Sequence, residues 1–134
     1  RNAACIEPYL DGHAMRSFAY PFGDMSPLRK LQAQTRFTTC RGNVAGINAG
    51  KIDFGDLPAE RIYEQTIDHD RVAALLRTIT VSPAGLVFYT HDVAEKPSPY
   101  GCSPGTFERV VRQVKQAGAA VLTGREAAAL ARGR

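Results

Sequence analysis

The sequence predicts an α/β fold in which parallel strands alternate with helices. Apolar residues recur at helical spacing within residues 68–80 and 107–117, which is typical of amphipathic helices. Residues 85–90 form a continuous apolar run of strand length, which favours a strand buried on both faces, as in a parallel sheet. Proline and glycine signals separate the segments. The order β-α-β-loop-α-β-α-β-α therefore predicts an open α/β sheet or part of a (β/α) barrel.

The first half of the chain is predicted to contain two strands, a helix and a long loop. Ser26 followed by Pro27 supplies an N-cap and a proline at the first helical position, so a helix is expected to begin there. The β-branched and aromatic residues at 36–40 favour a strand. The expected elements are a strand at 17–22, a helix at 26–34, a strand at 36–40, a loop at 41–56 and a short extended segment within 57–65.

The second half carries clearer helix boundaries. Ser103 followed by Pro104 repeats the cap-plus-proline signal, and Gly118 suits the position just past the end of that helix. Thr123 with Glu126 three residues later predicts a capping box. The expected elements are a helix at 68–80, a strand at 85–90, a helix at 104–117, a strand at 119–122 and a helix at 124–131.

Length and composition indicate a single domain, or part of one, over residues 1–134. The chain is 44% hydrophobic and 22% charged, which suits a globular domain with its own core. No apolar stretch approaches the length of a membrane span, and no signal-peptide pattern is present, so the compartment is unknown. The net charge of +4 comes from scattered basic residues without interleaved aromatic residues, so nucleic acid is not expected as a partner.

Several polar groups are better explained by structure than by chemistry. Asp68 and Asp70 of "DHD" suit a helix N-terminus, so capping explains them better than a metal site. Ser82 and Ser103 each precede a proline, which indicates turn or helix capping. The three cysteines lie far apart without metal-ligand spacing and are expected to be buried or partly buried thiols. No GxSxG, P-loop or GxGxxG motif supports a serine hydrolase, an NTPase or a dinucleotide enzyme.

Two motifs follow predicted strands, and in α/β folds chemistry gathers at the carboxyl ends of strands. His91 and Asp92 follow the strand at 85–90, where a histidine beside a carboxylate can act as a general acid or base. An equally weighted alternative is a histidine that hydrogen-bonds a loop and an aspartate that caps a turn. The segment "AYPFGD", residues 19–24, either ends a strand or presents backbone N–H groups to a ligand.

The two motifs together suggest a family. "FAYPFGD", followed about seventy residues later by "LVFYTHD", resembles the C-terminal portion of polysaccharide deacetylases of the NodB-homology type. The resemblance covers nearly the whole chain. It implies a deformed (β/α) barrel that uses a divalent metal, commonly zinc, to hydrolyse acetyl groups from an acetylated polysaccharide or oligosaccharide, acting on C–N bonds that are not peptide bonds.

The resemblance assigns roles to individual residues. His91 matches the general acid that protonates the leaving amine, and Val87 and Tyr89 match residues that line the pocket for the acetyl methyl group. The Phe22 backbone N–H would face the oxyanion, whereas Ala19 stands where the family often has an arginine. The residues expected to bind substrate are Tyr20, Pro21, Phe22, Gly23, Val87, Tyr89 and Asp92.

The family's metal-binding motifs, a Thr-Phe-Asp-Asp-Gly strand end and a His-Ser/Thr-x-x-His pair, do not occur in this sequence. The resemblance therefore implies that the metal ligands are not in this chain and lie upstream or were lost. We expect the isolated chain neither to bind zinc tightly nor to release acetate, and to associate with itself through exposed barrel edges. Two alternatives stay open: a non-catalytic carbohydrate-binding or interaction module of the same fold, and an α/β scaffold without a site.

Overall fold

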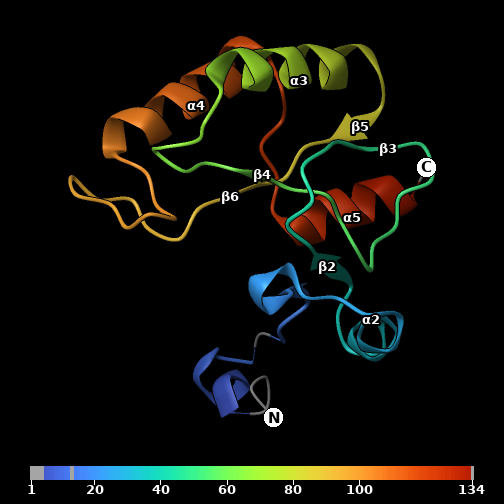
Figure 1. Ribbon diagram of the computed structural model, residues 1–134. Helices are drawn as coiled ribbons and strands as arrows, with labels where there is room; N and C mark the ends of the chain where they lie inside the picture. Colours follow the sequence, from blue (N-terminus) through green and yellow to red (C-terminus); the bar gives the residue numbers. More distant parts are fainter. Residues whose placement is uncertain (1–4, 13, 134) are drawn as a thin grey trace. The chain divides into compact units, whose positions relative to one another are not determined.

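The computed structural model describes residues 5–12 and 14–133 and shows a mixed α/β chain (Figure 1). The chain divides into two compact units. The first comprises Arg1–Gly42, Phe54–Asp56 and Leu122–Arg134, and the second comprises Asn43–Asp53 and Leu57–Val121. Each unit has its own strands, helices and core.

The first unit is built around a β-α-β motif. Its elements are η1 (Glu7–Tyr9), β1 (Ser17–Ala19), η2 (Pro21–Gly23), α2 (Pro27–Gln34), β2 (Thr39–Arg41) and α5 (Gly124–Arg132). Strands β1 and β2 pair in parallel, with Phe18 opposite Cys40. Tyr20, Ala33 and Cys40 form the buried core, and the partly buried rings of Phe18 and Phe37 pack against it. The predicted strand-helix-strand order is confirmed in this unit.

Helix α5 begins with a capping box and is attached to the rest of the first unit through Arg132. The Thr123 hydroxyl accepts the Glu126 N–H, and the Glu126 carboxylate accepts the Thr123 N–H, so the predicted capping box is confirmed. At the other end of the helix, Arg132 donates to the Thr38 carbonyl at 3.0 Å and its guanidinium lies 4.5 Å from the centre of the Phe54 ring.

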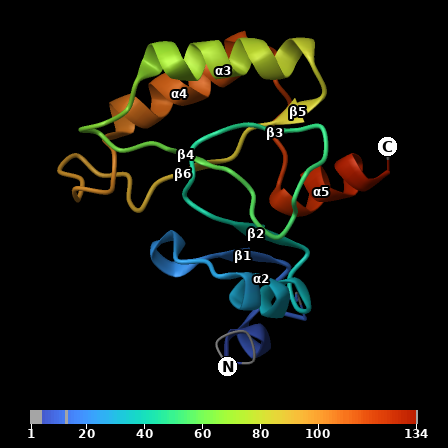
Figure 2. The same cartoon turned by 45° about the vertical axis from the view of Figure 1, so that its right-hand side comes forward.

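The second unit packs two helices beside short strands. Its elements are β3 (Asn48–Ala49), β4 (Glu60–Arg61), α3 (His69–Val81), β5 (Ala84–Gly85), β6 (Phe88–Tyr89) and α4 (Pro104–Gln116). Helices α3 and α4 lie side by side in both Figure 1 and Figure 2. Ile62, Cys102 and Val110 form the buried core, with Phe88 packed against it. Burial of each large aliphatic side chain contributes about 1.5–3 kcal/mol of hydrophobic stabilisation.

The helix boundaries follow the local capping signals in the sequence. Ser26 and Ser103 each accept a hydrogen bond from a backbone N–H in the first turn of α2 and α4. Asp68 accepts the N–H groups of Asp70 and Arg71 at the start of α3, which confirms capping as the role of this aspartate. Gly118 follows α4 with φ = 69°, a conformation that favours glycine, so the predicted stop is confirmed.

The expected strand at 85–90 is wrong in length and burial, and its parallel pairing is confirmed only for β6, which pairs with β4. The run divides into β5 and β6, and residues 86–90 are only partly buried. Strand β5 pairs antiparallel with β3, which lies inside the predicted loop at 41–56. The β3–β5 and β4–β6 pairs are each only two residues long. Because such short pairs cover little of either face of residues 85–90, this segment is only partly buried.

Three further strand boundaries differ from the prediction. The strand at 17–22 stops at Ala19, because Pro21 lacks a backbone N–H and Phe22 adopts a φ of 58° in the turn η2. The strand expected at 36–40 is shifted to β2. Residues 119–122 form no strand in the described chain, because they have no β partner to satisfy their backbone groups.

The described strands form three separate two-stranded sheets, β1–β2, β3–β5 and β4–β6. The α/β class is confirmed at this level, while the part of a deformed (β/α) barrel that the resemblance implies is not shown by the described strands. Within the described residues, every helix is too short or too polar to cross a membrane.

Candidate functional site

The second unit brings a histidine and three tyrosines together at the ends of two parallel strands. Strands β4 and β6 pair in parallel, with Arg61 opposite Tyr89. Tyr63 follows β4 by two residues, and His91 follows β6 by two residues. Since parallel strands end at the same edge, both side chains come from the carboxyl edge of this sheet, where α/β proteins commonly bind ligands.

The rings at this edge form what we call the strand-end aromatic cluster, made of Tyr63, Tyr89, His91 and Tyr100. The His91 ring centre lies 5.5 Å from that of Tyr100 and 6.0 Å from that of Tyr63. Tyr63 also makes edge-to-face contacts with Tyr89 at 5.7 Å and with Tyr100 at 5.8 Å. The Arg61 guanidinium lies 6.0 Å from the centre of the Tyr63 ring, at the limit of a cation–π contact. His91 is exposed, and Tyr100 is 59% exposed.

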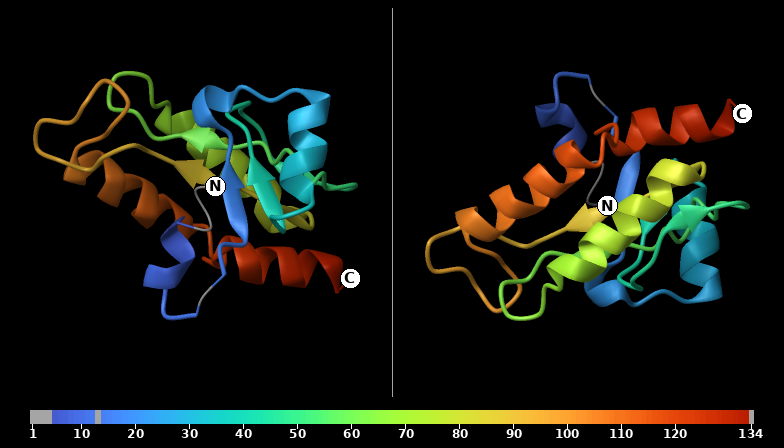
Figure 3. Two further views of the ribbon diagram at one scale, coloured as in Figure 1. Left: turned by 90° about the horizontal axis from the view of Figure 1, so that it is seen from below. Right: turned by 90° about the horizontal axis from the view of Figure 1, so that it is seen from above.

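The loop that carries Tyr100 is fixed to the end of β6 by backbone hydrogen bonds. In both views of Figure 3 this loop, drawn gold to orange, runs out from β6 and doubles back to the start of α4. The His91 N–H donates to the Tyr100 carbonyl at 3.1 Å, and the Cys102 N–H donates to the Asp92 carbonyl at 3.0 Å. The Ala94 N–H returns a bond to the Cys102 carbonyl at 3.1 Å. These bonds place Tyr100 beside His91.

The Asp92 carboxylate closes the loop from inside. One of its oxygens accepts the Ser98 hydroxyl at 2.6 Å, and the other accepts the Ser98 N–H at 3.0 Å. The hydroxyl and then the N–H of Ser98 hold the pKa of Asp92 below its ordinary value of 3.8. The structure therefore gives Asp92 the turn-capping role that was one of the two alternatives, and its contact with substrate stays a prediction.

Gly101 lets the loop close tightly. A Cβ atom at this position would lie 2.1 Å from Asp92 Oδ1 and 2.9 Å from the Asp92 carbonyl oxygen, closer than carbon and oxygen can approach. A side chain at residue 101 would therefore push Asp92 and its turn away. The glycine is required by the close approach rather than by an unusual φ.

Glu64 joins the loop to the start of α4. Its N–H donates to the Gly101 carbonyl at 2.8 Å, and its carboxylate accepts the Ser103 N–H at 2.6 Å and the Thr106 hydroxyl at 2.9 Å. The Ser103 N–H and then the Thr106 hydroxyl hold the pKa of Glu64 below 4.5. The carboxylate thus acts as an additional cap of α4 and fixes the far end of the loop.

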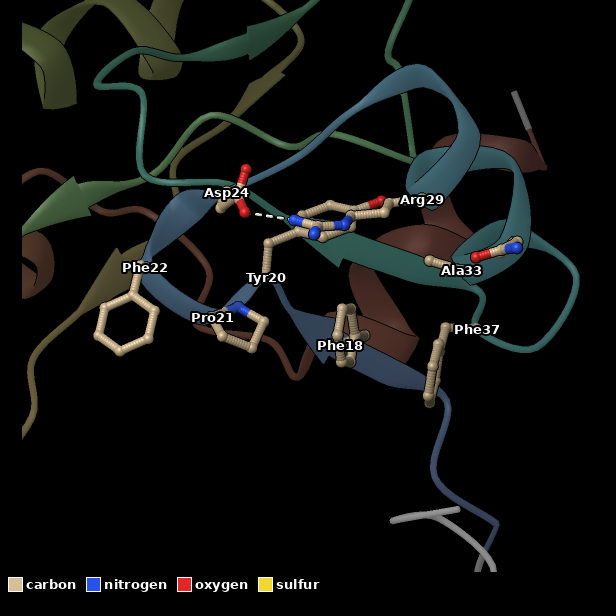
Figure 4. Close-up of a pocket in the computed structure, with 9 residues that line it drawn as sticks. Phe18, Tyr20, Pro21, Phe22, Asp24, Arg29, Ala33 and Phe37 are labelled. Atoms are coloured by element: carbon tan, nitrogen blue, oxygen red, sulfur yellow. Dashed lines mark hydrogen bonds and ion pairs between the residues drawn. The ribbon is translucent and has the colours of Figure 1, made fainter.

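The "AYPFGD" motif forms a tight turn in the first unit. Tyr20 is buried, and its hydroxyl donates to the Gly55 carbonyl at 2.9 Å. Gly23 donates back to the Tyr20 carbonyl at 2.9 Å and has φ = 70°. Phe22 has φ = 58° and is 97% exposed, and Figure 4 shows its ring pointing away from Phe18. A bulky residue in the left-handed region is uncommon and is found in strained turns.

A cavity of about 420 Å³ lies in the first unit beside this turn (Figure 4). The rings of Phe18 and Phe37 stack with their centres 4.9 Å apart along one side of it. Arg29 forms an ion pair with Asp24, which supplies the charged part of the lining. The lining residues are Phe18, Tyr20, Pro21, Phe22, Asp24, Arg29, Gln32, Ala33 and Phe37.

The predicted site residues are distributed over both units. The second unit holds Val87, Tyr89, His91 and Asp92, and the first unit holds residues 20–23. Val87 and Tyr89 are half-buried, and their carbonyls accept backbone N–H groups along β4. Their contact with an acetyl group and the role of the Phe22 N–H stay predictions.

Sequence reasoning missed Tyr63 and Tyr100, the two neighbours of the His91 ring. Tyr63 carried a usable signal, because an aromatic residue shortly after an expected strand lies at the same sheet edge as His91 if the strands are parallel. Tyr100 carried none, since only the folded loop returns it to His91.

The described residues do not offer a metal centre. Across residues 5–12 and 14–133, no group of three or more His, Cys, Asp and Glu side chains could hold a metal ion. His69 of "DHD" has its ring Nδ1 3.1 Å from the Gln113 amide oxygen, which joins α3 to α4. Cys40 and Cys102 are buried free thiols, as expected, whereas the prediction is wrong for Cys5, which is exposed.

Comparison of the chain with protein-family models, with curated proteins and with solved structures finds no match.

Proposed function

We propose that this chain is part of a polysaccharide deacetylase, a hydrolase that removes the acetyl group from an acetylated amino sugar, with His91 as the general acid. The observation that carries the proposal is the exposed His91 ring at the carboxyl end of β6, flanked by the Tyr63 and Tyr100 rings. A proton donor is useful only where substrate can reach it, and this ring is accessible.

The reaction requires a proton at one defined step. Hydrolysis adds water across the C–N bond of the acetamido group, and the amide nitrogen must be protonated as that bond breaks because an amide anion is a poor leaving group. A protonated imidazole can donate this proton, and general acid catalysis of this kind contributes about 10²–10⁴-fold to the rate. The His91 N–H bond to the Tyr100 carbonyl fixes the backbone from which the imidazole projects.

The family resemblance also implies a divalent metal, but the described residues do not fit one. The contribution assigned to this chain is therefore a proton and a surface for the sugar. The carboxylates of Glu64 and Asp92 are not suited to bind a metal, since both already accept hydrogen bonds that hold the loop.

A second candidate function is a non-catalytic carbohydrate-binding module. The strand-end aromatic cluster favours it independently of any chemistry, because aromatic rings bind the apolar faces of sugars whether or not a bond is broken. The two candidates differ in a single observable, which is the release of acetate.

The test compares two histidine variants in the full gene product that carries this chain. With N-acetylglucosamine oligomers and added zinc as substrate and metal, His91→Gln is expected to lower kcat by about 10²-fold or more with little change in KM. His69→Gln is the matched control, because this histidine belongs to the same unit and contacts Gln113 outside the site.

Acetate release that is unchanged in His91→Gln would contradict the assignment of His91 as the general acid. Binding of the oligomers without any acetate release by the unmodified protein would instead favour the carbohydrate-binding module.

A further inference from the structure

We infer that Tyr63 and Tyr100 form a stacking site for one pyranose ring beside His91. The inference rests on the proposed function, because it names where the sugar lies relative to the proton donor. It assigns a substrate-binding role to two residues that neither the sequence motifs nor the resemblance singled out.

The Tyr100 ring is exposed to solvent. Rings that only fill a core are buried, yet Tyr100 is 59% exposed while its ring centre lies 5.5 Å from that of His91 and 5.8 Å from that of Tyr63. An exposed aromatic residue that is also ordered by its neighbours is typical of a binding site.

The backbone of Tyr100 is pre-organised by hydrogen bonds within the loop. The Tyr100 N–H donates to the Ser98 hydroxyl oxygen at 3.3 Å, and its carbonyl accepts the His91 N–H. Ser98 is itself held by both oxygens of Asp92. Because the backbone on either side of Tyr100 is fixed before ligand arrives, little loop entropy is lost on binding. A tyrosine side chain has two rotatable bonds and adds a small further cost.

An aromatic ring and the face of a pyranose are chemically complementary. A pyranose with equatorial substituents, such as N-acetylglucosamine, exposes axial C–H groups that carry partial positive charge, and an aromatic face carries partial negative charge. The phenol hydroxyls of tyrosine can bond the sugar hydroxyls at the ring edge. Because the His91 ring centre lies 5.5 Å from that of Tyr100, a sugar that stacks on Tyr100 lies beside the proposed proton donor.

The experiment uses substitutions at Tyr100 with an exposed tyrosine elsewhere as control. Binding of N-acetylglucosamine oligomers is measured by calorimetry, and folding of each variant is checked by circular dichroism. Tyr100→Ala is expected to raise Kd about tenfold, and Tyr100→Phe, which keeps the ring, to change it by about threefold or less. Tyr9→Ala removes a tyrosine that is 84% exposed in the first unit and is expected to leave Kd unchanged.

A fluorescence measurement covers the case in which Tyr100→Ala perturbs the loop. The chain has no tryptophan, so Tyr100→Trp and Tyr9→Trp each introduce a single tryptophan whose emission can be excited selectively. Saturable oligomer-dependent change in emission is expected for Tyr100→Trp and not for Tyr9→Trp. Equal responses from the two variants, unchanged Kd in Tyr100→Ala, or absence of saturable binding by the unmodified chain would overturn the inference.

The stacking site and the proposed reaction can fail separately. Loss of binding in Tyr100→Ala, together with no acetate release by the unmodified protein, supports the stacking site and removes the deacetylase proposal. Loss of acetate release in His91→Gln together with unchanged sugar binding in Tyr100→Ala removes the stacking site and leaves the reaction in place.

Discussion

The two segments that follow β1 and β6 are held in different ways, although both strands belong to parallel pairs. The loop after β6 is fixed by many contacts, which include the Asp92–Ser98 bonds and the close approach of Gly101 to Asp92. The turn after β1 is three residues long and places a left-handed backbone on one bulky residue, Phe22. Many contacts together hold the loop after β6, whereas in the turn after β1 the strain falls on the backbone of one residue.

This difference predicts opposite signs for substitutions in the two segments. No residue of the loop at 91–103 has a positive φ, so a substitution relieves no such strain there and an added atom meets neighbours that are held in place. In the turn a single residue carries an unfavourable φ, so a substitution there can relieve strain. Stability measurements on both segments test the comparison directly.

Gly101→Ala is expected to have the largest effect on stability. The new Cβ would lie 2.1 Å from Asp92 Oδ1 and 2.9 Å from the Asp92 carbonyl oxygen, so the turn must move. We expect the free energy of unfolding to fall by about 2 kcal/mol, measured by urea denaturation. Gly105→Ala is the matched control, because its Cβ would meet only the Ser103 hydroxyl oxygen at 3.9 Å and alanine favours the helix.

A double substitution sharpens this prediction. In an Asp92→Ala background the two nearest side-chain atoms are gone, and the cost of Gly101→Ala should become smaller. Equal costs in both backgrounds would show that Asp92 is not what excludes a side chain at residue 101.

Acidification is expected to have an intermediate effect that is confined to the loop. The pKa of Asp92 is lowered when the chain is folded, so its contribution to stability is fully present above the ordinary value of 3.8 and is lost as the pH falls through the lower folded value. Amide exchange at Ser98 and Tyr100, measured by NMR, should accelerate below that pH relative to the intrinsic rate.

Asp92→Asn provides the comparison for this pH dependence. The amide cannot ionise, so exchange at Ser98 should be faster than in the unmodified chain at neutral pH and should show no further change on acidification. An unchanged acid profile in Asp92→Asn would assign the effect to another carboxylate, such as Glu64, which accepts hydrogen bonds from Ser103 and Thr106 at the end of the loop.

The sequence predicts the helices of this chain much better than its strands. The N-caps of the helices are Ser26, Asp68, Ser103 and Thr123. Each of them accepts a hydrogen bond from a backbone N–H two or three residues further along the chain. Signals of such short range can be recognised without knowing the fold. This locality explains why all four helix starts are confirmed.

The strands and the site depend on contacts between distant segments. The β3–β5 pair joins residues more than thirty positions apart, and nothing local in Asn48 or Gly85 announces it. The neighbourhood of His91 was likewise predictable only in part. His91 could be selected from its place after a strand, while Tyr63 reaches it through the β4–β6 register and Tyr100 through the folded loop.

Phe22→Asn is expected to have the smallest effect on stability and the opposite sign. Asparagine adopts the left-handed conformation more readily than phenylalanine, and Phe22 is 97% exposed, so little buried surface is lost. We expect the free energy of unfolding to rise by about 0.5 kcal/mol. Gly23→Ala, at φ = 70°, is the control in the same turn and should lower it by about 1 kcal/mol.

The same variant tests whether Phe22 is retained for binding. A residue that costs stability and covers no core is explained if it contacts a ligand, and the family resemblance predicts that Phe22 binds substrate. Phe22→Asn should then weaken binding of N-acetylglucosamine oligomers while it stabilises the fold. A variant that is more stable and binds the sugar as tightly as the unmodified chain would remove the substrate-binding role predicted for Phe22.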